Sequence, residues 1–199
     1  MIAFVEGVIE EKQPTRLVLN VAGVGYEILV PLSSYDRLPE TGRHCRVLTY
    51  DYVRDDTHQL FGFVTEEERG MFVLLMATSG VGPKLALGAL SGMSVRELRA
   101  AVIEGDVRRL SSISGVGRKT AERLIVELRD RISQGEALDA LSRGGSGEAE
   151  GKLRDAALAL AALGYQPDAA RKMASDAIRR HGDAELSLED LIRRALGSS

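Results

Sequence analysis

The chain has 199 residues, of which 44% are hydrophobic and 28% are charged, and its formal net charge is −3. This composition is ordinary for a globular protein with one large domain or two to three small ones, and it argues against a polycation that coats nucleic acid. The charge is nevertheless uneven. Residues 1–63 carry six basic and nine acidic side chains, whereas residues 64–134 carry eleven basic and nine acidic ones, so the central segment is the most basic.

The sequence carries no signal for export, membrane insertion or metal binding. The first residues, MIAFVEGVIEEKQ, are acidic where a secretory signal would be basic, and no apolar run approaches the about 18 residues of a membrane helix. A single cysteine, Cys45, excludes an internal disulfide. The histidines His44, His58 and His181 lack ligand spacing. We therefore expect a cytoplasmic protein with no metal and no other cofactor.

Residues 1–63 are predicted to form a small β-barrel. Alternating or β-branched runs recur between turn signals such as Ala22-Gly23. The five runs are IAFVEGVIEE, RLVLNV, VGYEILVPL, CRVLTYDYV and HQLFGFV. A polar segment at 33–38 favours one helical turn between the third and fourth strands. Five strands with a helical insertion there are typical of an OB-like barrel, which often binds nucleic acids or sugars.

Residues 64–134 change to a helical period. Apolar residues recur at helical spacing through MFVLLMA and AERLIVELRDRI. Thr65 with Glu68, and Ser94 with Glu97, have the order of a capping box, in which the hydroxyl accepts a bond from an early amide and the glutamate reaches back. We expect this segment to be a helical domain.

The remaining residues are predicted to form a linker and a small helical domain. Residues 135–151 are rich in Gly, Ser and Glu and have no large apolar side chain after Leu141, which indicates a flexible linker. Residues 152–199 contain three helical patterns, closed by Gly164 or opened by Pro167 and Ser187. The predicted fold class is therefore multidomain α+β, ending in a three-helix domain.

A nearly identical hexapeptide occurs twice, as SGVGPK at 79–84 and SGVGRK at 114–119, each time between two predicted helices. Each Gly-Val-Gly is interpreted as an interhelical hairpin. The first glycine would permit positive φ, the valine would point back between the helices, and the second glycine would leave the next helix's amides uncovered. These residues are Gly80, Val81 and Gly82 in the first copy and Gly115, Val116 and Gly117 in the second.

The hairpins have the elements of a phosphate site. Free N–H groups at the positive end of a helix dipole attract anions, and Lys84 and Lys119, one turn into each helix, add a mobile positive charge. The pattern therefore indicates a helix-hairpin-helix pair that holds a nucleic-acid backbone without reading bases.

The duplication of the hexapeptide favours a phosphate grip over a purely structural turn. A tight corner between helices would account for a single copy, but not for two copies that are each followed by a basic residue. Neither copy has the G-x-x-x-x-G-K-[ST] spacing of a nucleotide P-loop. Aromatic residues form only 5% of the chain and tryptophan is absent, whereas base flipping or single-strand binding would use stacking surfaces.

Four segments carry a resemblance to the RuvA family. They are VGYE at 24–27, VRDDTHQLFGF at 53–63, SGVGPKLAL with LSGMS, and SGVGRKTAERLIVEL at 114–128. The likeness extends over nearly the whole chain. It implies a subunit without catalytic activity that binds Holliday junctions and holds them open and square for branch migration in DNA recombination and repair.

The resemblance also implies partners. The expected ones are four-way junction DNA and the hexameric ATPase RuvB, which supplies ATP hydrolysis and pulls the duplex arms through. RuvC resolvase is a further expected partner. The chain itself is expected to form a homotetramer, acting alone or as two tetramers that sandwich the junction.

Roles carry over to individual residues through the same resemblance. The DNA-binding set is Gly80, Gly82, Lys84, Gly115, Gly117, Arg118, Lys119 and Arg123. Asp55 and Asp56 match an acidic pin at the junction centre, and Arg54 beside them would attract the departing backbone. The family often has Glu-Asp at the pin, and Pro where this chain has Ser114, but neither departure removes a charge or a glycine.

Several alternatives stay open at this point. Asp55 and Asp56 also fit a solvated turn. Leu163 and Tyr165, beside Gly164, are either an exposed contact for the motor or part of a three-helix core. A helix-hairpin-helix DNA glycosylase would use a catalytic acid such as Asp130, although a solvated helix face explains that residue more simply. A processivity clamp or nuclease accessory module would share the hairpins but would not need the acidic pair.

Overall fold

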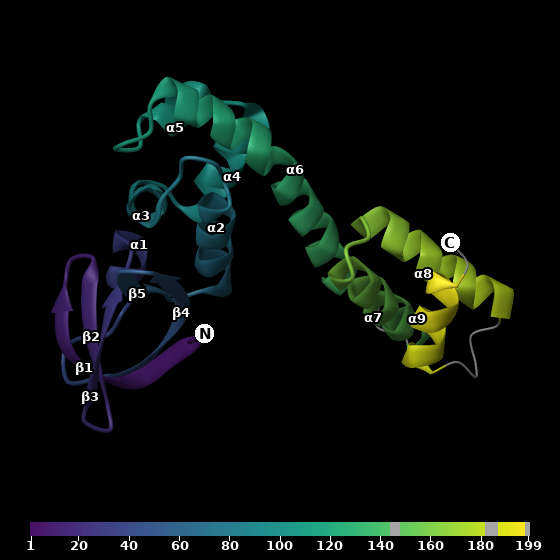
Figure 1. Ribbon diagram of the computed structural model, residues 1–199, viewed down its shortest axis with the longest axis horizontal. Helices are drawn as coiled ribbons and strands as arrows, with labels where there is room; N and C mark the ends of the chain where they lie inside the picture. Colours follow the sequence, from purple (N-terminus) through teal and green to yellow (C-terminus); the bar gives the residue numbers. More distant parts are fainter. Residues whose placement is uncertain (144–147, 182–186, 198–199) are drawn as a thin grey trace. The chain divides into compact units, whose positions relative to one another are not determined.

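The chain forms two compact units, Met1–Arg129 and Asp130–Ser199 (Figure 1). A computed structural model describes residues 1–143, 148–181 and 187–197, with side chains described for 1–133, 151–180 and 187–197. No helix in these ranges is long and apolar enough to cross a membrane.

The N-terminal part of the first unit is a closed five-stranded barrel, as predicted (Figure 1). Its strands are β1 (Phe4–Gln13), β2 (Arg16–Val21), β3 (Val24–Leu29), β4 (His44–Arg54) and β5 (Thr57–Phe63). They neighbour one another in the order β1-β2-β3-β5-β4, and all pairs are antiparallel except β3 with β5. The short helix α1 (Leu32–Tyr35) confirms the predicted turn between the third and fourth strands.

Alternation along the strands fills the barrel interior. In β2, for example, Leu17 and Leu19 are completely buried while their neighbours are partly exposed. Gly62 in β5 shows how little space remains. A Cβ there would lie 2.5 Å from Ile28 Cγ2 and 2.7 Å from Val47 Cγ1, so only glycine fits at this position.

Five helices follow the barrel, in agreement with the predicted helical domain. They are α2 (Glu66–Met76), α3 (Pro83–Gly92), α4 (Val95–Glu104), α5 (Val107–Ser111) and α6 (Arg118–Arg143). The predicted capping box at the start of α4 is complete, because Ser94 Oγ accepts from Glu97 N–H at 3.2 Å and the Glu97 carboxylate accepts from Ser94 N–H at 3.0 Å. The bond from Ser94 N–H, with a second from the Ser94 hydroxyl to the same carboxylate at 2.8 Å, holds the pKa of Glu97 below its ordinary value.

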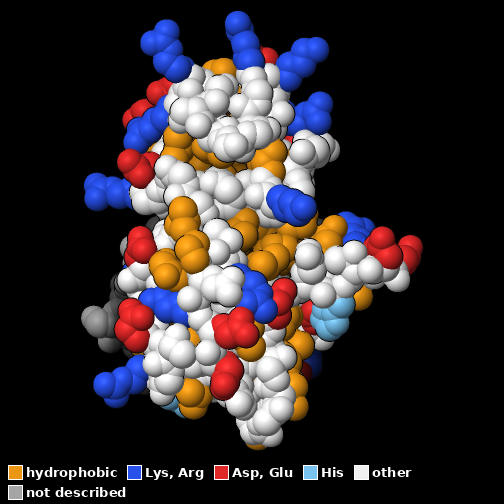
Figure 2. All heavy atoms as spheres, turned by 90° about the vertical axis from the view of Figure 1, so that its left-hand side faces the viewer, with side chains coloured by type: hydrophobic (Ala, Val, Ile, Leu, Met, Phe, Trp, Pro, Cys, Tyr) orange, Lys and Arg blue, Asp and Glu red, His pale blue; other side chains and the backbone are white. Residues whose placement is uncertain are grey.

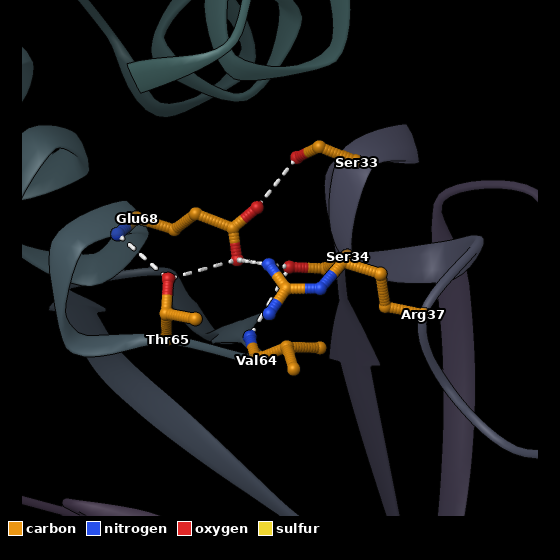
Figure 3. Close-up of polar contacts among 6 residues, drawn as sticks. All are labelled: Ser33, Ser34, Arg37, Val64, Thr65 and Glu68. Atoms are coloured by element: carbon orange, nitrogen blue, oxygen red, sulfur yellow. Dashed lines mark hydrogen bonds and ion pairs between the residues drawn. The ribbon is translucent and has the colours of Figure 1, made fainter. Parts of the chain in front are cut away.

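The capping box predicted at the start of α2 forms only in part. Thr65 Oγ1 accepts from Glu68 N–H at 3.2 Å, but the Glu68 carboxylate turns to α1, where it accepts from the hydroxyls of Ser33 at 2.8 Å and Ser34 at 2.9 Å (Figure 3). Arg37 Nη1 lies 3.9 Å from the same carboxylate. The carboxylate reaches back to Thr65 only through the Thr65 hydroxyl, at 3.4 Å. Hydroxyl groups from a distant segment satisfy the rest of this buried side chain, which thereby links α2 to the barrel.

Aromatic packing also fixes α2 to the barrel. The ring of Phe72 in α2 lies 5.1 Å from Phe61 and 5.0 Å from Phe63, centroid to centroid, and all three side chains are fully buried. Tyr50 of β4 meets the Phe72 ring at 5.4 Å with its edge. The barrel and the first helix of the helical part therefore share one core.

In the described part of the second unit, three helices after α6 pack around a core of mostly small residues. These helices are α7 (Glu148–Ala162), α8 (Pro167–His181) and α9 (Leu188–Leu196). The buried residues are Ala156, Ala157, Leu160, Ala170, Ala174, Ala177, Leu191 and Ala195. Gly164 has φ of 101° after α7, and Ser187 Oγ accepts from Asp190 N–H at 3.1 Å at the start of α9. The predicted three-helix domain is confirmed.

Helix extends into both ends of the predicted linker at 135–151, since α6 continues to Arg143 and α7 begins at Glu148. The sequence there is rich in Ala, Leu and Glu, whose high helix propensity favours helix without burial of large side chains. Residues 144–147, at the centre of the predicted linker, lie outside the described residues.

Candidate nucleic-acid interface

The two hexapeptides fold into hairpins with the same backbone. Gly80 has φ of +80° and Gly115 has φ of +85°, as the sequence predicted. In each hairpin the central valine donates its N–H to the carbonyl three residues before it, at 3.1 Å for Val81 and 3.0 Å for Val116. Both valines are buried, which confirms that they point back between the helices. The first hairpin joins α2 to α3, and the second joins α5 to α6.

The second glycine of each hairpin leaves a helix N-terminus open. The first hydrogen bond of α3 runs from Ala86 N–H to Gly82 O at 3.0 Å, and that of α6 runs from Ala121 N–H to Gly117 O at 2.9 Å. The amides before these have no acceptor within their helix. Apart from the adjoining backbone, no atom that the structure describes lies within 4 Å of a Cβ built on Gly82 or Gly117, so both positions face open space.

The hairpins differ in the number of amides that they offer. In α6 the N–H groups of Arg118, Lys119 and Thr120 precede the first helical bond. In α3 the corresponding first residue is Pro83, which has no N–H. The second hairpin therefore has one more donor, and Arg118 adds a cation where the first hairpin has none.

The predicted cations surround these helix starts. Lys84 and Lys119 are both exposed, and neither forms an ion pair or hydrogen bond with any residue that the structure describes. Arg118 forms an exposed ion pair with Glu122 at 2.9 Å, which contributes little to stability and can be exchanged for a ligand. Figure 2 shows blue Lys and Arg side chains gathered at the helical end of the first unit, above a barrel where carboxylates are interspersed.

Arg123 lies beside the first hairpin although it belongs to the helix that follows the second. Its Nη1 donates to Ser79 O at 3.2 Å and lies 3.3 Å from the position that a Cβ on Gly80 would take. Glu127, one turn further along α6, accepts from Ser79 N–H at 3.0 Å. Glu127 was not predicted from the sequence. Its spacing of four from Arg123 places both on one helix face, but no sequence signal says that this face meets the first hairpin.

Asp55 and Asp56 form the two-residue turn between β4 and β5, as predicted, with Arg54 and Thr57 paired across its base. Thr57 Oγ1 donates to Asp56 Oδ1 at 3.1 Å, and both aspartates are exposed. β4 pairs with β1 only up to Leu48, so the end of the β4–β5 ribbon extends beyond the barrel sheet. The turn therefore presents two carboxylates at a projecting tip.

The side chains beside this tip hold it in place. Arg54 Nε donates to Tyr52 Oη at 3.2 Å, and the guanidinium lies over the Tyr52 ring. At the base of the ribbon, Asp51 contacts His58 Nε2 at 2.7 Å and accepts from Ile2 N–H at 3.0 Å. Burial raises the pKa of Asp51, but these two bonds, together with the charges of His58 and the N-terminus, hold the pKa below its ordinary value.

In the second unit, Leu163 and Tyr165 flank the turn that ends α7. Leu163 is 62% exposed and Tyr165 is 37% exposed, and neither belongs to the buried core of the three helices. The alternative that they pack this core is therefore wrong. Leu188, the first residue of α9, is a further exposed apolar side chain of this unit.

The features that would support other chemistry are weak. Among the described residues, no group of three or more His, Cys, Asp or Glu could hold a metal ion. Asp130, the candidate acid of a glycosylase, is exposed on α6.

Three family models match the chain in order. They are the RuvA N terminal domain over residues 1–62, a SAM-like helix-hairpin-helix tandem over 72–130, and the RuvA C-terminal domain over 151–198. Proteins named Holliday junction branch migration complex subunit RuvA match along nearly their full length. The protein of Thioalkalivibrio sulfidiphilus is 45% identical over 200 residues, with 98% of each chain covered. That of Methylococcus capsulatus is 43% identical over 203 residues, covering 100% of this chain and 99% of the relative.

The chain belongs to the RuvA family. A third RuvA relative, from Actinobacillus succinogenes, is 43% identical over 204 residues and covers 98% of each chain. The matched RuvA domains cover all of the barrel except its last residue and nearly all of the three C-terminal helices, and the helix-hairpin-helix match encloses both hairpins. The resemblance drawn from the sequence is therefore confirmed.

Proposed function

We propose that this chain binds Holliday junctions by their phosphate backbone and holds them open for branch migration. The observation that carries the proposal is the repeated geometry of the hairpins. Both copies have the same backbone bonds, an open helix N-terminus and a lysine without a partner among the described residues. A corner that served packing alone would need neither the open amides nor the lysine in both copies.

Binding of this kind is independent of base sequence. Amides at a helix N-terminus and lysine side chains contact phosphate oxygens, which are the same at every base pair. Each neutralised phosphate releases condensed counterions, so the affinity falls steeply as salt rises. Two grips in one chain, repeated in a homotetramer, would hold several duplex arms at once.

The acidic turn supplies selectivity. Asp55 and Asp56 repel phosphates from the place that the ribbon tip occupies, and Arg54 beside them attracts a backbone that passes the tip. In a homotetramer these turns would surround the point where strands cross. A continuous duplex would be disfavoured there, whereas the open centre of a four-way junction would not.

The second unit is proposed to dock the motor. Leu163 and Tyr165 present apolar surface that a RuvB-type hexameric ATPase could cover, and that partner would hydrolyse ATP while this chain catalyses no reaction. A RuvC-type resolvase completes the proposed set of partners. Removal of residues 152–199 should leave junction binding intact and abolish stimulation of the motor ATPase. A truncated chain that still drives branch migration would contradict this division of roles.

The test of the main proposal compares two DNA molecules with one sequence. Dissociation constants for a four-way junction and for a linear duplex are measured at the same salt concentration. We expect a preference for the junction of about a hundredfold, somewhat below the usual range of specific over non-specific DNA binding because no bases are read. Equal affinities would instead support a general clamp or accessory module, which shares the hairpins but has no use for the acidic turn.

A further inference from the structure

Two side chains of α6 hold the peptide groups of one residue in the first hairpin. Glu127 accepts the N–H of Ser79 at 3.0 Å, and Arg123 donates to the carbonyl of the same residue at 3.2 Å. Ser79 directly precedes Gly80, whose positive φ makes the turn. The position of the first hairpin loop is therefore tied to side chains that lie 44 and 48 residues further along the chain.

The same helix begins at the second hairpin. Gly117 immediately precedes α6, so one rigid element carries the second phosphate grip at its start and holds the first grip with its second and third turns. The helix that follows the first hairpin also lies near the second, because Leu85 of α3 is 3.9 Å from the position that a Cβ on Gly115 would take. Fixed spacing between two grips reduces the ordering that DNA binding would otherwise require.

Glu127 has the wrong charge for a DNA-binding surface. A carboxylate near bound phosphates costs affinity, and its removal should improve binding if charge were its only effect. Its hydrogen bond to Ser79 N–H indicates a structural role within the protein instead of a contact with DNA.

We infer that Glu127 is a positioning residue for DNA binding, which acts through Ser79, together with Arg123, to hold the first hairpin in register with the second. The inference rests on the proposed function of the hairpins as phosphate grips. It also gives Arg123 a role in addition to the direct phosphate contact expected from the sequence.

The direction in which a single substitution changes the affinity for the junction tests the inference. Glu127→Ala removes the acceptor and one negative charge, and Glu104→Ala removes one exposed negative charge from α4, where Glu104 has no partner among the described residues. We expect Glu127→Ala to weaken junction binding about tenfold, comparable to the loss of a hydrogen bond to a charged group, while Glu104→Ala leaves it unchanged or tighter. Glu127→Gln keeps an acceptor oxygen and should retain the parent affinity. Equal binding by the two alanine variants would overturn the inference.

A double-mutant cycle shows through which hairpin Glu127 acts. Lys84→Ala weakens the first grip and Lys119→Ala weakens the second. Because Glu127 is inferred to act on the first, its alanine variant should be non-additive with Lys84→Ala and additive with Lys119→Ala. The reverse pattern, or additivity with both lysines, would count against the inference.

Amide hydrogen exchange on the free protein separates this inference from the proposed function. Glu127→Ala should speed exchange at Ser79 about tenfold while amides within α2 and α3 keep their protection, and Glu127→Gln should restore the parent rate. Unchanged exchange at Ser79 would show that Glu127 does not hold the first hairpin in solution. If exchange responds as expected but the parent protein shows no preference for junctions, the positioning role of Glu127 is supported and the proposed function fails.

Discussion

The two hairpins share a backbone but differ in what surrounds it. The second offers the N–H and the cation of Arg118 at the place where the first has Pro83. The first is instead held from outside, by Arg123 and Glu127 on either side of the Ser79 peptide groups. Beside the second lies the apolar side chain of Leu85 in α3, 3.9 Å from the position that a Cβ on Gly115 would take.

Comparison of the two hairpins shows which features both share for phosphate binding and which features occur in one copy only. The positive φ at the first glycine, the buried valine and the open helix start occur in both copies, and they make the grip. The number of donors and the way in which the loop is held differ between them. The copies should therefore contribute unequally to binding, and substitutions can measure by how much.

The largest effect is expected from covering both open helix starts. Gly82→Leu combined with Gly117→Leu places bulk where the DNA backbone would approach. The fold should tolerate it, because both sites face open space and Gly82 has an ordinary φ of −94°. We expect the junction dissociation constant to rise about a thousandfold, whatever the DNA sequence, as several charge-assisted bonds are lost. Of the single variants, Gly117→Leu should cost more, because its helix offers one more amide.

The control for this prediction is thermal unfolding of each variant. An unfolding midpoint near that of the parent shows that the glycines serve the ligand and not the fold. Parent-like junction affinity in the double variant would contradict the assignment of both hairpins.

The second prediction exchanges the residues that distinguish the copies. Arg118→Pro removes one N–H and one cation from the second hairpin, and proline is well suited to the first position of a helix. We expect about tenfold weaker junction binding with little change in stability, since the Arg118–Glu122 pair is exposed. The reciprocal Pro83→Arg should strengthen binding. If neither exchange alters affinity, the difference in donor number has no consequence.

The third prediction concerns what the copies have in common. The plot of log K against log salt has a negative slope. Lys84→Ala and Lys119→Ala should each reduce the magnitude of this slope by about 0.9, the value for one phosphate contact. Lys172→Ala in α8 removes the same charge from the second unit and should leave the slope unchanged. The measurement is a salt titration of junction binding, and an unaltered slope in both hairpin variants would be strong evidence against phosphate contacts there.

Local patterns predicted much of this architecture. The alternation in RLVLNV, the glycines of the hexapeptides and the Ser94 cap act over a few residues, so the sequence displays them directly. The contacts that join these pieces are different. Glu68 meets Ser34, 34 residues away, and Glu127 meets Ser79, 48 residues away. A glutamate on a helix face has the same local pattern whether it meets solvent, a distant hydroxyl or a distant backbone N–H, so tertiary packing alone decides its partner.

The last prediction concerns the acidic turn, which should repel the DNA phosphates that the hairpins attract. Asp55→Asn combined with Asp56→Asn removes two charges from an exposed tip and keeps the size of the side chains, so the fold should be unaffected. We expect binding to linear duplex to strengthen about fivefold, a modest effect because exposed charges are screened by water and salt. Binding to the junction should change less, since its centre leaves room for the tip, and the preference for junctions should narrow.

The measurement compares duplex and junction dissociation constants for parent and double variant at one salt concentration, and the rate of branch migration with the motor should change as well. Raising the salt should shrink the difference between the two proteins on duplex, because screening weakens repulsion in the parent and has nothing to weaken in the variant. If the variant matches the parent in both duplex affinity and selectivity, Asp55 and Asp56 are only a solvated turn. Junction preference would then have to come from the spacing of the hairpin grips, and substitutions at Glu127 should affect it more than those at the turn.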